Sequence, residues 1–384
     1  MGIPVTGRIS LSILTLLTFF GHAFTQTIDD RDMTLMKMEE IRPLVVRDTV
    51  SVVFGGDFMM HKAQIDNSLR EGVHSFEGSF SPAVMDLIGN AGLAVGNMEF
   101  TLGGVPYTGY PSFSAPETFP EYISSCGMDV FLLANNHILD KSAKGAERTV
   151  MHYRSMRDTC GIRFTGCGTD PAEFDATNPL YLRLSGIKVA FINFTYGTNH
   201  SFSAAYPKVS RMTKENLAGL FGKARNDGAE LIVALPHWGT EYSLKSSETQ
   251  REWAGWIASQ GADIIIGSHP HVVQEAGEIQ TGSGKSVPVI YSLGNAISNM
   301  SAQNTRIGLF VRLRITRDTE GNAVILGPEY TYTWCTLPGR LTDRHTTVSV
   351  KEFEGRRDEW AMPYDYDCMM STYMHVKKTT GIQD

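Results

Sequence analysis

The sequence predicts an α/β fold, in which short buried strands alternate with amphipathic helices. Three observations predict it. Short apolar runs recur from Val50 onward, segments with helical spacing of apolar residues separate several of them, and most runs end in Asp, Glu, Asn or His. Because ligands bind beyond the carboxyl ends of strands in such sheets, these polar residues are expected to meet in one crevice.

The expected strands are apolar runs that each lead into a polar turn: Ser51–Phe54, Leu93–Val95, Val130–Ala134, Val189–Ile192, Leu231–Leu235, Ile264–Ile266 and Val289–Leu293. The expected helices are Pro82–Asn90, Pro116–Cys126, Lys141–Asp158, Thr213–Asn226 and Ser246–Gln260. Beyond residue 305 the pattern becomes β-rich, over Ile307–Ile315 and Val324–Trp334. We therefore expect one domain over residues 49–300, with residues 301–384 adding strands that complete the sheet and then an irregular tail.

The N-terminus has the pattern of a secretory signal peptide. Arg8 precedes the uncharged run Ile9–Phe20, and Gly21 and Ala23 provide small residues for cleavage. The run is shorter than the ~20 apolar residues of a membrane span, so an uncleaved anchor is the alternative. We expect a signal peptide over residues 1–23, a linker over 24–48, and export to the periplasm or the cell exterior, with membrane association left open.

Charge and cysteine usage narrow the function class. The net charge is -7, and no stretch gathers the Lys and Arg residues into a basic run. Nucleic acid is therefore not expected as a partner, since phosphate binding needs a basic surface. The five cysteines are an odd number, so at least one has no partner within the chain. Cys160 and Cys167 are close enough in sequence for a bridge, and buried free thiols are the alternative.

The strongest local signal for chemistry is His269-Pro270-His271, which follows an apolar run. Two imidazoles two residues apart in an extended turn can each reach a metal ion. Taken singly, an Asp at a strand end can cap a helix and an Asn is a common turn residue. Taken together, the candidate ligands are Asp57, Glu99, Asn136, His237, His269 and His271. Nitrogen and oxygen donors of this kind suit one or two divalent ions of manganese, zinc or iron.

Six segments carry a family resemblance: Gly56–Met60, Gly96–Glu99, Ala134–Asp140, Pro236–Tyr242, Gly267–Gln274 and Tyr291–Asn295. In this order they resemble the CapA, or poly-γ-glutamate capsule-synthesis, proteins of the calcineurin-like metallophosphoesterase superfamily. The resemblance implies a four-layer α-β-β-α sandwich, with two β-sheets packed face to face and helices outside. To this metallophosphoesterase-like sandwich the C-terminal residues would add their β-rich extension.

The resemblance also implies roles for the candidate ligands. Asp57 and His271 would hold a first ion, and Glu99 would bridge it to a second. The three remaining ligands would hold the second ion. His137 would not bind metal and would act as a general acid oriented by Asp140. Two ions side by side can clamp the attacking and leaving oxygens of a displacement, and an imidazolium can protonate the leaving group.

One position departs from the superfamily pattern. Members carry a second ligand two residues after the first Asp, and this chain has Met59, a poor ligand for such cations. A single-ion centre is therefore an alternative, and His61 is a candidate substitute or a surface residue. Weaker candidates for contacting the substrate or supporting the ligands are His61, Asn97, Asn135, Glu241, Tyr242 and Asn295. An ordinary surface carboxylate is the alternative for Glu241.

Three functions remain open from the sequence. The first is a metal-dependent hydrolase or transferase acting on a phosphoester or acyl bond of a capsule or envelope polymer, with capsule-synthesis membrane proteins as candidate partners. The second is a non-catalytic, metal-containing protein that binds polymer or a partner; Met59 favours it, whereas His137 and Asp140 oppose it. The third is a phosphatase for small substrates. Family resemblance points to capsule production, but no residue selects poly-γ-glutamate over polysaccharide or lipid-linked phosphate.

Overall fold

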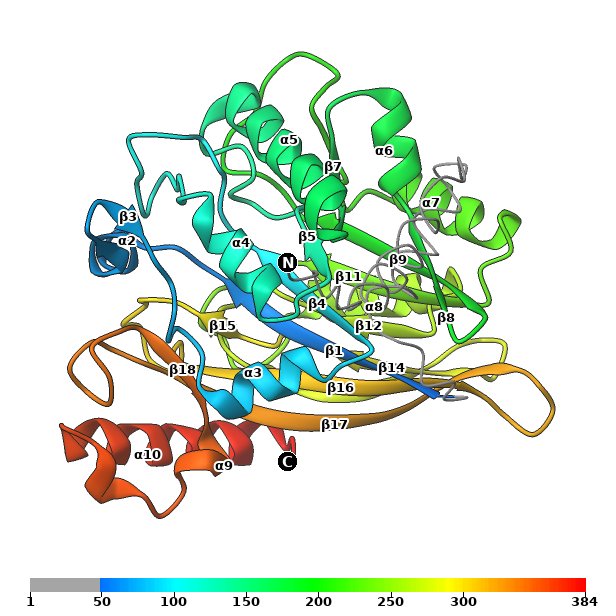
Figure 1. Ribbon diagram of the computed structural model, residues 1–384. Helices are drawn as coiled ribbons and strands as arrows, with labels where there is room; N and C mark the ends of the chain where they lie inside the picture. Colours follow the sequence, from blue (N-terminus) through cyan, green and yellow to red (C-terminus); the bar gives the residue numbers. More distant parts are fainter. Residues whose placement is uncertain (1–48) are drawn as a thin grey trace, which may run out of the picture.

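The computed structural model describes residues 49–384, so the expected signal peptide (1–23) and linker (24–48) lie outside the described residues. The described chain forms four layers: helices, a first sheet, a second sheet and further helices (Figure 1). This confirms the α-β-β-α sandwich of the metallophosphoesterase-like fold that the sequence motifs implied.

The first sheet has eight strands in the order β18-β17-β16-β1-β4-β5-β6, with β15 beside β1. Their bounds are β1 Thr49–Phe58, β4 Leu93–Met98, β5 Val130–Leu132, β6 Arg163–Thr165, β15 Asn295–Ile297, β16 Ile307–Arg317, β17 Ala323–Thr336 and β18 Thr346–Ser349. Strands β1, β4, β5 and β6 are parallel, whereas β16, β17 and β18 join by antiparallel pairing. The C-terminal strands thus extend this sheet.

The second sheet has six strands in the order β13-β14-β12-β11-β9-β8. Their bounds are β8 Leu180–Leu184, β9 Ile187–Thr195, β11 Leu231–His237, β12 Ile264–Ile266, β13 Ala276–Gln280 and β14 Ser286–Ile290. The inner four strands are parallel and the two edge strands are antiparallel. Two small ribbons complete the strands: β2 Leu69–Arg70 with β3 Val73–His74, and β7 Cys167–Gly168 with β10 Lys208–Val209.

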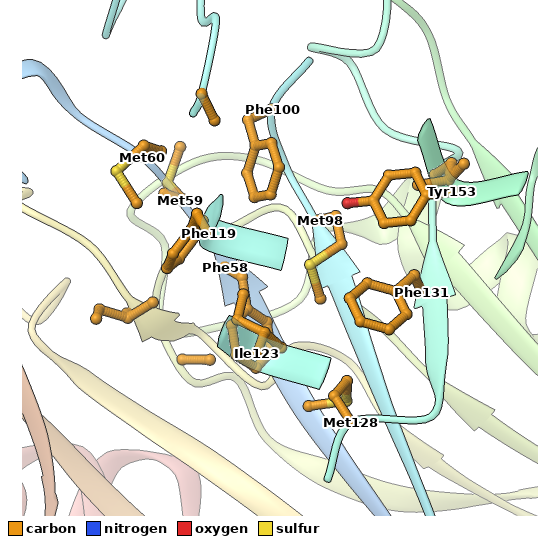
Figure 2. Close-up of a cluster of buried hydrophobic side chains, with 14 of the residues drawn as sticks. Phe58, Met59, Met60, Met98, Phe100, Phe119, Ile123, Met128, Phe131 and Tyr153 are labelled. Atoms are coloured by element: carbon orange, nitrogen blue, oxygen red, sulfur yellow. The ribbon is translucent and has the colours of Figure 1, made fainter. Parts of the chain in front are cut away.

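Apolar side chains fill the three spaces between the layers. One buried cluster joins the two sheets. A second lies between the first sheet and its covering helices α3 (Pro82–Gly89), α4 (Thr118–Ser125) and α5 (Ser142–Cys160). Figure 2 shows part of this cluster, with Phe119 and Ile123 of α4 and Tyr153 of α5. A third lies under α7 (Lys214–Asn226) and α8 (Glu248–Ser259). All five helices lie close to the expected ranges. Short helices are α2 Lys62–Ser68, α6 Pro171–Thr177, α9 Val350–Phe353 and a 3-10 turn at Arg357–Glu359.

Strand β1 is longer than expected, and this changes the setting of Asp57. The sequence predicted a strand that ends before Gly55, but β1 continues to Phe58. The reason is β15, which pairs with β1 at Asp57 and leaves the Asp57 N–H donating to the Gly294 carbonyl oxygen at 2.9 Å. A Cβ atom on Gly56 would lie 1.9 Å from that same oxygen, so only glycine allows the two strands to approach this closely.

The C-terminal segment also differs from the expected irregular tail, because Pro363–Thr380 forms helix α10. Its buried face includes Met369, Tyr373 and Val376, which belong to the same apolar cluster as the residues between the sheets. The rings of Tyr373 and Tyr332 meet edge to face, with centroids 5.2 Å apart. The apolar stripe of α10 is narrow, and this weakened its signal in the sequence. Within residues 49–384 no helix, α10 included, is long and apolar enough to cross a membrane.

The cysteines of the described chain are all free thiols. Cys160 is exposed at the end of α5, whereas Cys167 is buried on β7. The bridge between them that the sequence allowed is not formed. The alternative, buried free thiols, holds for Cys126, Cys167 and Cys335, whereas Cys160 is exposed and Cys368 half-buried.

Candidate metal centre

The six candidate ligands meet where the carboxyl ends of the parallel strands of both sheets adjoin. Asp57 lies on β1, and Glu99 directly follows β4. His237 ends β11, and a bridge pairs it with Ser268, the residue before His269. None of the six side chains is more than 3 % exposed. The structure therefore brings together, in a buried position, polar residues that are far apart in the sequence.

Two groups of donor atoms in this cluster could each hold an ion. Asp57, Glu99 and His271 place one donor atom each within 4.8 Å of one another, as do Glu99, His237 and His269. Glu99 belongs to both groups and so lies between them. Asn136 adds its amide oxygen to the second group, because Asn136 Oδ1 is 2.9 Å from His237 Nε2. The two groups have the same members as the two ligand sets implied by the family motifs.

The separations between donor atoms fit shared ions. His237 Nε2 and His271 Nε2 each lie 3.6 Å from Glu99 Oε1. Ligands about 2.1 Å from one ion are themselves roughly 3.0–3.4 Å apart, depending on the coordination angle. The observed spacing is therefore close to that of ligands arranged around a cation.

Neighbouring side chains orient two of the histidines. His237 Nδ1 is 3.0 Å from Ser268 Oγ, and His271 Nδ1 is 3.1 Å from Asn295 Oδ1. A hydrogen bond donated by Nδ1 leaves Nε2, the nitrogen 3.6 Å from Glu99 Oε1, with the lone pair that could bind a metal ion. Asn295 was among the weaker candidates from the sequence, whereas Ser268 was missed.

The electrostatics of the cluster favour a cation. Burial, and then the Asp57 carboxylate, raise the pKa of Glu99 well above its usual value. Burial, and then the neighbouring imidazoles, lower the pKa of His237 far below its usual value and that of His269 to about 3. The buried atoms Glu99 Oε1 and His269 Nδ1 have no hydrogen-bond partner. A divalent ion would satisfy such carboxylate and neutral imidazole donors, so the residues fit a metal.

The backbone is strained at the two candidate ligands around Pro270. His269 has a φ of 100° and His271 a φ of 59°, in a region that favours glycine. Such residues cost about 1–3 kcal/mol each and concentrate at functional sites. The His269 N–H donates to Asp57 Oδ2 at 3.1 Å, so one candidate ligand helps to hold the turn that carries two others.

His137 lies beside the cluster and has its own carboxylate partner. His137 Nδ1 is 2.7 Å from Asp140 Oδ2, and both residues are buried. The same oxygen accepts the Phe113 N–H at 2.8 Å, which fixes the carboxylate. His137 belongs to none of the groups of residues that could hold a metal in the described chain. The amide nitrogen of Asn199, a residue missed by sequence reasoning, is 3.2 Å from His137 Nδ1.

Two weaker candidates from the sequence, Asn97 and Asn135, form hydrogen bonds that hold the site in place. Asn97 donates to Asp57 Oδ1 at 2.7 Å and so orients this candidate ligand. Asn135 donates to the Met98 carbonyl oxygen at 2.7 Å and accepts the His137 N–H at 3.1 Å. Both amides therefore fix the strand ends to one another rather than facing a substrate.

Met59 and His61 supply no further ligand. Met59 is buried in the apolar cluster beneath the outer helices, beside Phe58 and Met60 (Figure 2). His61 precedes α2, where its Nδ1 accepts the Asn299 N–H at 3.3 Å, and burial lowers its pKa to about 4. In the described part of the chain, His61 belongs to no group that could hold a metal.

Exposed side chains on two loops lie beside the cluster. Glu241 is exposed and forms a third candidate group with His269 and His271. Tyr242 is exposed beside it with a φ of 67°. Tyr196, missed by sequence reasoning, is also exposed, and its ring centroid is 4.7 Å from that of His269. Tyr196 follows the strand β9, and a strand end was the signal that could have found it.

Two face-to-face sheets with outer helices and a cluster of His, Asp, Glu and Asn at the strand ends define a metallophosphoesterase-fold protein. A sequence model of the family described as "Bacterial capsule synthesis protein PGA_cap" matches residues 51–300. The chain belongs to this capsule-synthesis family, which confirms the CapA resemblance of its motifs.

Two curated relatives agree with the family. Capsule biosynthesis protein CapA of Bacillus anthracis is 30% identical over 217 residues, which cover 55% of this chain and 50% of the relative. PGA biosynthesis protein CapA of Bacillus subtilis is 28% identical over 191 residues, or 49% of this chain and 47% of the relative. The chain thus spans about half the length of the curated relatives it matches.

Among solved structures, the chain is similar to the calcineurin-like phosphoesterase YfkN from Bacillus subtilis. The TM-score is 0.36 and the identity 14%, and the match covers 74% of this chain and 90% of that chain.

Proposed function

We propose that this chain is an exported, metal-dependent hydrolase or transferase. Its target would be a phosphoester or acyl bond of a capsule or other envelope polymer, either poly-γ-glutamate or a polysaccharide. The bound ions would be one or two of manganese, zinc or iron, since imidazole, carboxylate and amide donors suit these borderline cations. Export rests on the signal-peptide pattern of residues 1–23, and the polymer on the family and on the names of its relatives.

The observation that carries the catalytic part of the proposal is that candidate metal ligands and a histidine–carboxylate pair lie side by side. Buried donor atoms that could hold two ions lie beside a histidine that is not among them. That histidine, His137, has a buried carboxylate 2.7 Å from its Nδ1. A centre that only bound metal would have no need of this second pair.

Some residues of the site would bind the metal ions, and others would transfer a proton. Ions bound at the two groups would supply Lewis-acid polarisation of the bond under attack. The Asp140 carboxylate fixes a proton on His137 Nδ1, so that Nε2 is the nitrogen that delivers a proton to the leaving group. Asn97 orients Asp57, and Ser268 and Asn295 orient the histidine ligands, so the donor atoms are held in place before a substrate arrives.

The test compares two variants of the metal-loaded protein on phosphodiester, phosphomonoester and acyl reporter substrates and on isolated capsule polymers. His137→Ala is expected to keep the metal content and to lower kcat roughly 10²–10⁴-fold. His269→Ala is expected to lose at least one ion and, with it, the activity. Turnover that survives His137→Ala unchanged would contradict the role of His137, and a loaded wild-type protein inert on every substrate would contradict the enzyme.

A specific observation favours a second candidate, a non-catalytic metal-containing protein that binds polymer or a synthesis partner. The position of one superfamily ligand is occupied by Met59, which is buried among apolar side chains. A binding protein predicts that polymer production in cells survives His137→Ala and fails with His269→Ala. The enzyme predicts that it fails with both.

A further inference from the structure

Glu241 occupies a position that the fold alone does not explain. It is an exposed carboxylate on the loop after β11, yet one of its oxygens lies within 4.8 Å of ligand nitrogens of His269 and His271. His269 is only 3 % exposed, and its Nδ1 has no hydrogen-bond partner. A solvent-exposed carboxylate therefore lies close to two buried imidazoles, and each of these imidazoles belongs to one of the other candidate metal groups.

The loop that carries Glu241 is fixed to the turn that carries those histidines. The Tyr242 N–H donates to the Pro270 carbonyl oxygen at 2.9 Å. Gln274, buried just beyond the turn, donates from Nε2 to the carbonyl oxygens of Ser243 at 2.8 Å and Lys245 at 3.2 Å. These hydrogen bonds fix the backbone that carries the Glu241 carboxylate beside the cluster. An ordinary surface Glu has no such constraint.

Counting donors shows which ion lacks a ligand. The second group has four protein donors: Glu99, Asn136, His237 and His269. The first group has three, from Asp57, Glu99 and His271. Four protein ligands are common in closed sites of such ions, and three leave a position to be filled. The Glu241 group shares His271 with the first group and His269 with the second, so Glu241 lies near both. Of the two groups, the first is the one that is a donor short and has a position for this carboxylate.

We propose that Glu241 is a ligand of the first ion and replaces the ligand lost at Met59. The missing donor is supplied from the loop after β11, on the second sheet, instead of from the end of β1 on the first. This inference rests on the proposed metal centre. It would make the centre a two-ion site in which each ion has four protein donors.

The test begins with the full chain, from which metal has been removed with a chelator. Mn²⁺ is titrated into this protein, and the binding is measured by calorimetry. Elemental analysis then gives the metal content of the loaded protein. Wild type is expected to bind two ions. Glu241→Gln is expected to keep one ion with unchanged affinity and to bind the other at least about tenfold more weakly. Glu241→Asp, which keeps the carboxylate, is expected to recover part of this loss. Glu252→Gln, at an exposed position of α8, is the charge-matched control and is expected to behave as wild type.

The outcomes separate the inference from the proposed function. Two ions bound by Glu241→Gln with wild-type affinities would overturn the role of Glu241 and leave the metal centre standing. A wild-type protein that binds one ion, equally well in Glu241→Gln, would also overturn it. A wild-type protein that takes up no metal would overturn the proposed function itself.

Discussion

At the scale of single residues, Glu99 is the side chain for which a bound cation would matter most. It is fully buried, it belongs to two of the three candidate metal groups, and its pKa is raised by burial and by Asp57. In the metal-free protein a raised carboxyl pKa gives stability that is present below the ordinary pKa and is lost as pH rises. Metal removal should therefore expose a pH-dependent instability that originates at this one residue.

The prediction is that Glu99→Gln abolishes binding of both ions and changes the stability of the metal-free protein in a pH-dependent way. Relative to metal-free wild type, the variant gains Tm as pH rises from about 4.5 to neutrality. Thermal unfolding of both chelator-treated proteins over this pH range checks it, with roughly 2 °C corresponding to 1 kcal/mol. A difference in Tm that does not vary with pH would contradict the assignment.

His345 gives the opposite pH dependence at a place remote in sequence from the ligands. Burial, and then His61 and Arg306, lower its pKa to about 4, and His345 Nε2 is 2.8 Å from Asn299 Oδ1. A lowered His pKa contributes stability above pH ~6.5 that is lost as pH falls towards 4, about 3 kcal/mol in total. His345→Gln, which keeps a donor to Asn299, is expected to lose less Tm than wild type between pH 6.5 and 4. Equal losses of Tm in the two proteins between pH 6.5 and 4 would contradict this.

At the scale of secondary-structure elements, the closeness of β1 and β15 determines where Asp57 lies. A Cβ atom at Gly56 would meet the Gly294 carbonyl oxygen at 1.9 Å, and backbone atoms cannot yield as a flexible side chain can. Gly56→Ala is therefore predicted to lower stability by about 3 kcal/mol or more. Gly277→Ala on β13, where an added Cβ meets nothing within 4 Å, is the matched control. Urea unfolding midpoints compare the two, and equal midpoints would show that the strands separate easily.

Helix α10 provides a second test, because two of its methionines differ in burial alone. Met369 is 0% exposed and belongs to the buried cluster that joins the sheets, whereas Met374 is 60% exposed on the same helix. Met369→Ala is predicted to cost about 2–5 kcal/mol, and Met374→Ala to stay within about 0.5 kcal/mol of wild type. Free energies of unfolding in urea measure both. A small loss for Met369→Ala would mean that α10 contributes little to the core.

At the scale of the whole molecule, the sequence predicts the parts that depend on local pattern. Buried parallel strands are continuous apolar runs, and their polar ends mark the crevice, so the main strands, five helices and the candidate ligands could be named. Contacts made by tertiary packing could not. Ser268 and Asn199 are ordinary loop residues until the chain folds them against His237 and His137. The narrow stripe of α10 and the pairing of β15 with β1 likewise depend on partners distant in sequence.

The central claim is that the ends of two sheets bring buried donors together into a metal centre. Elemental analysis of the mature protein purified without chelator, beside His269→Ala, tests it most directly. The account predicts near-stoichiometric transition metal in the wild-type protein, two ions per chain at saturation, and the loss of at least one ion in the variant. A wild-type protein that holds no metal, even after manganese or zinc is added, would contradict the account.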